Sequence, residues 1–169
     1  MEQHEAVHNG AMVAPGTHKR TPILVNMADV LPKPIDWLWY PYLAYGQLAF
    51  LDGDPGSGKS MLCLELASRL SMGGGLPLQN GTYSAVGGEK RRTLLLSAED
   101  ALDHTVAPRL ISMGADRSCI TVLRGELGFD GQTYNFTLDH IEMLAAAIEQ
   151  LMPALVIVDP IQAYMGKGN

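Results

Sequence analysis

Residues 53–60, with the sequence GDPGSGKS, constrain the fold of this chain more than any other stretch. They match the pattern GxxxxGKS/T without a gap. A short apolar run precedes them at residues 47–51, and apolar residues recur at helical spacing over residues 61–70. The sequence therefore predicts a strand, a glycine-rich loop and a helix in immediate succession.

A loop of this kind turns its backbone N–H groups inward, toward phosphate oxygens, and the following helix adds a partial positive charge. Lys59 would then reach the β- and γ-phosphates, and the Ser60 hydroxyl would bind the Mg²⁺ ion that bridges them. The alternative is a plain glycine-rich turn. We predict a site for ATP and Mg²⁺ whose nucleotide-binding residues are Gly53, Asp54, Pro55, Gly56, Ser57, Gly58, Lys59, Ser60 and Met61.

Apolar runs alternate with helical patterns along the rest of the chain. We predict strands at residues 93–97, 120–123 and 155–158, and helices at residues 101–113 and from a cap at Thr137 or Asp139 to residue 150. Strands that alternate with helices and are apolar on both faces indicate a parallel sheet covered by helices on each side. The predicted fold class is therefore a three-layer α/β/α fold. The connection over residues 73–92 is long enough to hold a local excursion.

Asp159 ends the apolar run LVIVD at residues 155–159. A carboxylate at the C-terminal end of a buried parallel strand lies where ligands bind in open α/β sheets. This is the Walker B pattern, in which Asp159 would hold the magnesium opposite Ser60. The alternative is a turn residue ahead of Pro160.

Glu99 and Asp100 follow the predicted strand at residues 93–97 and so belong to the same edge of the sheet. A carboxylate there can orient and activate the water that attacks a phosphate. Both residues could instead only cap the next helix, where acidic groups are favoured. We predict Glu99 as the catalytic base, together with Lys59 as a catalytic residue, and Asp100 as the helix cap.

Other residues near these motifs receive less specific interpretations. A lone helical histidine such as His104 is typical of a surface or packing residue, and residues 90–92, KRR, are typical of a solvated charge run. Arg109 could face a phosphate or a neighbouring subunit, and the sequence does not decide between them. The aromatic residues of residues 37–45 either pack against the sheet edge or form a platform for a nucleotide base.

Composition limits the class of protein. The chain has 169 residues, of which 47% are hydrophobic and 18% charged, as expected for one globular domain. Its net charge of −6 argues against a free-standing nucleic-acid-binding protein, because neutralising phosphates needs a surplus of Lys and Arg. We predict a flexible leader at residues 1–30 and one domain at residues 31–169.

Cellular location is predicted from cysteines and apolar stretches. Cys63 and Cys119 lie far apart and form no CxxC pair, which favours a reducing compartment. The N-terminus lacks a signal-peptide pattern, and the most apolar stretch, residues 37–51, is too short and too interrupted to span a membrane. The sequence therefore predicts a cytoplasmic protein without a membrane partner.

Four segments together resemble the RecA-like ATPases, and among them the RepA-like branch of plasmid and phage replicative helicases and related AAA-type ATPases. The segments are DWLWYPYLAYGQLAFLDGDPGSGKS, LLLSAED, APRLISMGAD and LVIVDPIQAY. SAED is the most specific of them, because this family is similar to RecA in carrying its catalytic glutamate between the two Walker motifs. The resemblance implies Lys59 and Ser60 for phosphate and magnesium, Glu99 for water activation and Asp159 for the metal.

The resemblance also implies what surrounds this domain. In such folds a strand after Walker B inserts between the Walker B and P-loop strands, and the chain ends at Asn169 before one. Residues 31–169 would therefore be the incomplete N-terminal portion of a RecA-like domain whose C-terminal strands are missing. Family members form hexameric rings, act on DNA and complete each ATP site with a neighbour's arginine or lysine. A fragment alone would therefore hydrolyse ATP weakly.

Three functional classes remain open. The first is a motor-type ATPase coupled to DNA replication or remodelling. The second is an ATP-dependent regulatory switch with little hydrolysis. The third is a P-loop kinase, against which SAED and the LVIVDP strand both argue.

Overall fold

A computed structural model describes residues 23–84, 88–128 and 131–166. The chain divides into two units, Met1–Pro34 and Ile35–Asn169. In the first, the described residues hold one short 3-10 helix, η1 (Met27–Asp29), whose start is capped because the Asn26 side chain accepts a hydrogen bond from the Ala28 N–H at 3.0 Å. The first 22 residues of the predicted leader lie outside the described residues.

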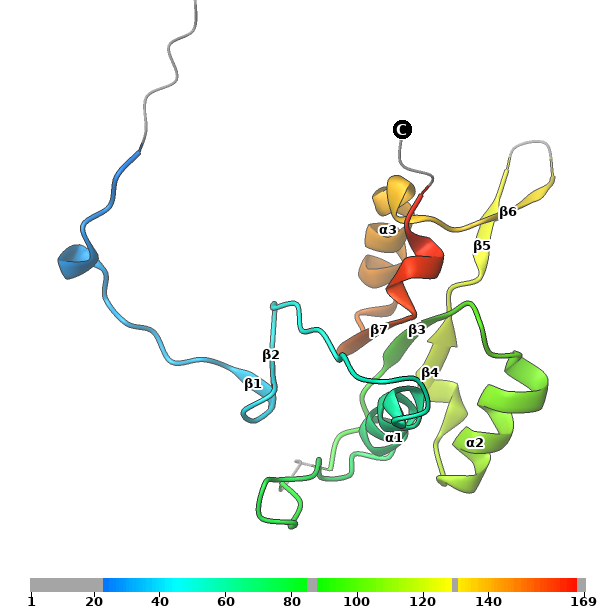
Figure 1. Ribbon diagram of the computed structural model, residues 1–169, viewed down its shortest axis with the longest axis horizontal. Helices are drawn as coiled ribbons and strands as arrows, with labels where there is room; N and C mark the ends of the chain where they lie inside the picture. The colour runs from blue at the N-terminus through cyan, green and yellow to red at the C-terminus, as the bar shows by residue number, and fades with distance from the viewer. Residues whose placement is uncertain (1–22, 85–87, 129–130, 167–169) are drawn as a thin grey trace, which may run out of the picture. The chain divides into compact units, whose positions relative to one another are not determined.

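The centre of the second unit is a parallel sheet in the order β4-β3-β7 (Figure 1). These strands are β3 (Thr93–Ser97), β4 (Ile120–Val122) and β7 (Leu155–Asp159). Three consecutive leucines of β3 are at most 2% exposed, as expected for a strand covered on both faces. The three strands confirm the apolar runs predicted after the glycine-rich loop, and with their helices they confirm an α/β fold.

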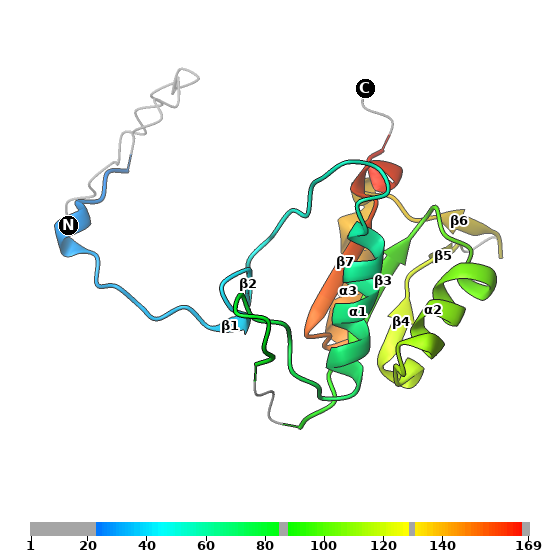
Figure 2. The same ribbon diagram turned by 60° about the horizontal axis from the view of Figure 1, so that its bottom comes forward.

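Helices cover both faces of this sheet. On one face Leu95 and Ile157 pack against α1 (Lys59–Ser71) and α2 (Ala107–Ser112). On the other, Leu94 and Leu96 pack against α3 (Ile141–Leu151) and the 3-10 turn η5 (Ile161–Tyr164). Figure 2 shows α1 running along β3 and β7. Because side chains alternate between the two faces of each strand, both faces of the sheet are apolar and each packs against helices. The RecA-like arrangement stays a prediction.

Two small antiparallel pairs complete the fold. One joins β1 (Trp37–Trp39) to β2 (Leu43–Ala44), and the other joins β5 (Gly125–Leu127) to β6 (Thr133–Asn135), a hairpin that the sequence did not predict. Trp39 packs against a buried cluster formed by Leu66, Leu70 and Leu76. Trp39 is therefore packed, but its main partner is α1 and not the edge of the sheet that was predicted, although Leu155 of β7 belongs to the same cluster.

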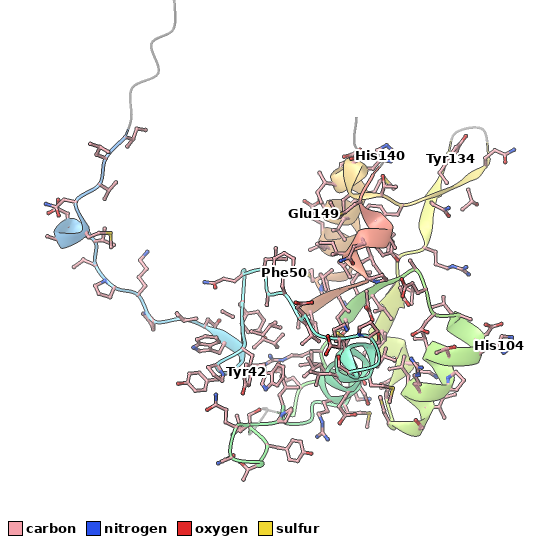
Figure 3. All side chains as sticks on the ribbon, viewed as in Figure 1. Tyr42, Phe50, His104, Tyr134, His140 and Glu149 are labelled. Carbon is pink, nitrogen blue, oxygen red and sulfur yellow. The ribbon has the colours of Figure 1, made fainter. Side chains whose placement is uncertain are left out.

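The strand predicted at residues 47–51 is wrong. These residues form no strand, and Leu48 and Phe50 are 80% and 74% exposed. Figure 3 shows Phe50 on the open connection that leads to α1. Among the described strands, β4 and β7 are the edges of the sheet, and residues 47–51 pair with neither, so their backbone groups have no ladder partner.

The helix predicted at residues 101–113 is divided. A π-helical turn, η2 (Leu102–Val106), comes first, and α2 follows it. Pro108 has no N–H to donate back to residue 104, so a regular α-helix cannot run through this point. The predicted cap of the later helix is also wrong. Thr137 precedes a separate 3-10 turn, η4 (Leu138–His140), and Asp139 lies within that turn. The residue before α3 is His140, and no side chain caps α3.

The connection after α1 contains the expected excursion. Its first glycine, Gly73, has a φ of +68°, and a Cβ there would lie 2.6 Å from the Gly88 carbonyl oxygen, so only glycine fits. Further along, Pro77 and Tyr83 form an isolated antiparallel bridge. Among the described helices, none is both long and apolar enough to cross a lipid bilayer.

Candidate active site

The glycine-rich loop leads directly into α1. The helix begins at Lys59, two residues earlier than predicted, so Lys59 and Ser60 lie in its first turn. Gly58 precedes the helix with a φ of +90°, and Gly56 has a φ of +77°. Nothing lies within 4 Å of a Cβ added at either glycine. The requirement for glycine here is therefore one of backbone conformation and not of space.

Lys59 folds back onto its own loop. Its ammonium donates hydrogen bonds to the carbonyl oxygens of Gly53 at 2.7 Å and Asp54 at 2.9 Å. The charged end of the side chain is thus already held over the loop, where a phosphate would enter. Binding a phosphate would exchange neutral carbonyl acceptors for charged oxygens, which form stronger hydrogen bonds with a cation.

The carboxyl ends of β3 and β7 bring the predicted acidic residues to one edge. Ser97 lies opposite Asp159 in the parallel ladder, and the Ala98 N–H donates to the Asp159 carbonyl oxygen at 3.4 Å. Glu99, one residue further on, is exposed. The sheet therefore places Glu99 and Asp159 at its carboxyl edge, as the order of the motifs predicted.

Asp159 also lies close enough to α1 to act on it electrostatically. Burial, and after it the charge of Asp159, raise the pKa of the Cys63 thiol to about 11. The pKa of Tyr164 is raised by the same two causes. Cys63 stands three residues after Ser60, so it lies near the same face of the helix as the Ser60 hydroxyl. From the sequence, Cys63 served only as evidence for a reducing compartment, although its spacing from Ser60 could have been read there.

Asp100 does not cap the helix that follows it, and this prediction is wrong. The residue before η2 is Ala101, and no side chain caps η2 or α2. Instead the Asp100 carboxylate accepts a hydrogen bond from the Arg109 guanidinium at 3.0 Å. The guanidinium of Arg109 offers two charged donors to a carboxylate, whereas the turn's N–H groups offer only partial charges. The sequence had left Arg109 without a partner.

His104 lies away from these residues. Its side chain is 86% exposed, and Figure 3 shows it on the outer side of the helical segment. This confirms the surface interpretation of His104. The Nε2 atom lies 3.4 Å from a carboxylate oxygen of its neighbour Asp103.

A magnesium ion would be held by a sparse set of protein oxygens. Within residues 23–84, 88–128 and 131–166, no group of three or more His, Cys, Asp or Glu side chains could hold a metal by itself. Ser60 and Asp159 offer a hydroxyl and a carboxylate, which are ligands that Mg²⁺ prefers together with water and phosphate oxygens. The residues present therefore fit Mg²⁺ that arrives with a phosphate ligand.

A cavity of about 610 Å³ lies at the opposite, amino edge of the sheet, lined in part by the cations of residues 90–92. Each of these cations already has a partner. In chain order they pair with the Asp116 carboxylate, the Tyr45 hydroxyl and the Leu151 carbonyl. Lys90 and Arg92 are exposed, as predicted for a solvated charge run, and the three cations also form hydrogen bonds with three neighbouring segments. The predicted acidic residues lie at the other, carboxyl edge of the sheet.

Residues 14–169 match the model of the protein family described as AAA domain. No curated protein and no solved structure matches the chain.

Proposed function

The chain belongs to the AAA-domain family of P-loop ATPases, and from this premise we propose that residues 53–61 and the carboxyl edge of β3 and β7 bind Mg-ATP and hydrolyse it. One observation carries the proposal. The ladder between β3 and β7 sets Ser97 against Asp159, so that Glu99 and Asp159 share the sheet edge next to the helix that begins at Lys59.

Each residue has a distinct role in this proposal. The N–H groups of the loop and the Lys59 ammonium bind the β- and γ-phosphates. Ser60 and Asp159 hold the Mg²⁺ ion, which when bound neutralises phosphate charge. Glu99 orients a water molecule and accepts its proton. The water oxygen bonds to the γ-phosphorus, the bond from that phosphorus to the bridging oxygen breaks, and ADP leaves with the electron pair.

The finer function rests on the resemblance to RepA-like helicases. We propose that hydrolysis is coupled to work on DNA, in replication or remodelling, by a ring of identical chains that is hexameric by analogy. Because the net charge of this chain is −6, its contacts with DNA would come from local basic loops. A regulatory ATP switch is the second candidate, and a P-loop kinase is the third.

Glu99→Gln tests the hydrolytic role, because an amide binds water but does not accept its proton at neutral pH. Turnover of ATP by the complete gene product, measured with and without single-stranded DNA, should fall by about 10²- to 10⁴-fold in this variant. The affinity for ATP should stay within about twofold. Glu89→Gln, the same chemical change at the amino edge, is the matched control and should leave turnover unchanged.

Each other outcome points to a different function. Turnover that survives Glu99→Gln removes Glu99 as the base and favours the switch or kinase proposals. Turnover that is lost in the variant but ignores DNA keeps the ATPase and removes DNA as a partner.

A further inference from the structure

Glu99 stands between two anchors. On its N-terminal side, the Ala98 N–H donates to the Asp159 carbonyl oxygen at 3.4 Å. On its C-terminal side, the Asp100 carboxylate accepts from the Arg109 guanidinium at 3.0 Å. The first anchor belongs to the sheet and the second to α2, so the segment that carries Glu99 is held from two directions.

Arg109, which supplies the second anchor, lies on the well-packed helix α2. Leu110, the neighbour of Arg109, is 4% exposed and packs in the same core cluster as Leu95 and Ile157. The end of α2 is also tied to α1, because the Ser68 hydroxyl donates to the Met113 carbonyl oxygen at 3.1 Å. The backbone of Arg109 is therefore fixed relative to both β3 and β7.

The π-helical turn η2 lies between Asp100 and Arg109 and affects the distance that separates their side chains. In η2 the Val106 N–H bonds the Ala101 carbonyl, five residues back, so the turn is wider than an α-helical one. Asp100 lies two residues before this turn and Arg109 three residues after it. π-Turns are frequent at functional sites.

On these observations, and resting on the proposed ATPase function, we propose that Arg109 is a positioning residue that acts through Asp100 to hold Glu99 in the orientation that activates water. Arg109 does not touch the nucleotide in this proposal. Its guanidinium fixes the Asp100 side chain, and the anchors at Ala98 and Asp100 together restrict the backbone that carries Glu99.

The ion pair is suited to orientation more than to stability. The Arg109 and Asp100 side chains are 37% and 34% exposed, so water screens much of their attraction. The loss of such a pair changes a local equilibrium by about three- to fivefold. That factor should appear in full in the opening of the Glu99 segment, because exchange follows the population of the open conformation. The fall in kcat should be smaller, because kcat follows the population of the held conformation, which remains the major one.

Hydrogen exchange at the Ala98 amide tests the positioning directly and needs no turnover. In the complete gene product, Arg109→Ala and Asp100→Ala should each speed this exchange by about three- to fivefold. Arg109→Lys keeps one charged donor and should lie between them and the wild type. Arg117→Ala removes an equally charged but exposed side chain from the amino edge and should change nothing.

ATP turnover then separates action through Asp100 from direct action. Arg109→Ala should lower kcat by no more than the factor by which it speeds exchange, with KM for ATP within about twofold. The double variant Arg109→Ala/Asp100→Ala should be no slower than the slower single variant, because the two residues act as one unit.

Several results would overturn the proposal. Unchanged exchange at Ala98 in Arg109→Ala removes the positioning role, even if Glu99→Gln still abolishes turnover and the ATPase proposal stands. A large rise in KM, or effects that multiply in the double variant, would give Arg109 its own contact with the nucleotide. A large drop in melting temperature would give it a structural role. Turnover that survives Glu99→Gln overturns this proposal together with the proposed function.

Discussion

Two apolar runs of equal length, residues 47–51 and the strand β3 at Thr93–Ser97, have opposite fates. Leu94, Leu95 and Leu96 are at most 2% exposed, whereas Leu48 is 80% exposed and Phe50 is 74% exposed. Both runs lead into residues of the proposed site. The difference teaches that an apolar run becomes a strand only where neighbours supply a ladder and a covering layer.

The strand β3 has neighbours on both of its edges and on both of its faces. It has parallel partners on both edges, β4 and β7, and helices cover both of its faces. Removing a leucine side chain from water stabilises the folded chain by about 1.5–3 kcal/mol, and the ladder satisfies the backbone groups at the same time. Residues 47–51 have neither contribution, so their backbone groups bond to water.

The largest effect should come from truncating a core leucine of β3. Leu96 is 0% exposed and packs with Phe136 and Tyr164. Leu96→Ala should lower the free energy of unfolding by about 3 kcal/mol, because it removes buried methyl groups and leaves a cavity. Phe50→Ala should stay within about 0.5 kcal/mol, since Phe50 is largely exposed. Urea unfolding followed by circular dichroism measures both.

A large loss in Phe50→Ala would break the comparison. It would mean that residues 47–51 are buried in the folded protein in solution. A loss of less than about 1 kcal/mol of unfolding free energy in Leu96→Ala would also contradict the comparison, because a cavity in a well-packed β3 should cost more than this.

Thiol reactivity tests the same contrast at the two ends of the glycine-rich loop. The pKa of Cys63, on α1, is about 11 against an ordinary 9.0, so at pH 8 its thiolate fraction is about a hundredth of the ordinary one. In a Cys119→Ser background, Cys63 should react with an aromatic disulfide at least about 100-fold more slowly than a free thiol. Replacing both cysteines by serine and adding Phe50→Cys should give a fast reaction.

Asp159→Asn sharpens this test. It removes the charge that contributes to the raised pKa of Cys63 and leaves the larger contribution, burial. The pKa should therefore fall part of the way toward 9.0, and the reaction should speed up without reaching the free-thiol rate. Equal reaction rates for Cys63 with and without the Asp159 charge would contradict the prediction, because they would mean that the end of β7 lies too far from α1 to act on this thiol.

The parts of the fold that the sequence predicted are those set by local periodicity. The helical spacing after Lys59, and the apolar runs that became β3, β4 and β7, each describe a segment that its own side chains suit. The short strands β5 and β6 have the sequences GEL and TYN, with too little apolar alternation to be recognised. Residues 47–51 failed because their pairing depends on a neighbour that no local pattern describes.

The candidate site divides in the same way. The spelling of the loop and the carboxylates after two strands predicted which residues gather at the carboxyl edge, because the ends of parallel strands meet there. The partner of Asp100 could not be predicted, since a π-turn separates it from Arg109 and changes their spacing. The roles of Lys59, Ser60, Glu99 and Asp159 stay predictions until turnover is measured.

The smallest effect should come from the amino edge of the sheet, where an exposed ion pair takes the place of packing. The Lys90 ammonium lies 2.7 Å from the Asp116 carboxylate, and its hydrogen bond, with those from Ser118, lowers the pKa of Asp116 from 3.8 to about 2. A depressed pKa stabilises the folded state above the unfolded value. This stability is lost as the pH falls from about 4 to about 2. Asp116→Asn should therefore lower the urea midpoint slightly at pH 7 and leave it unchanged near pH 2. Asp116→Asn could instead lower the free energy of unfolding at pH 7 as much as Leu96→Ala does. The exposed edge would then contribute as much to stability as the packed core, and the contrast between the two apolar runs would not extend to the rest of the sheet.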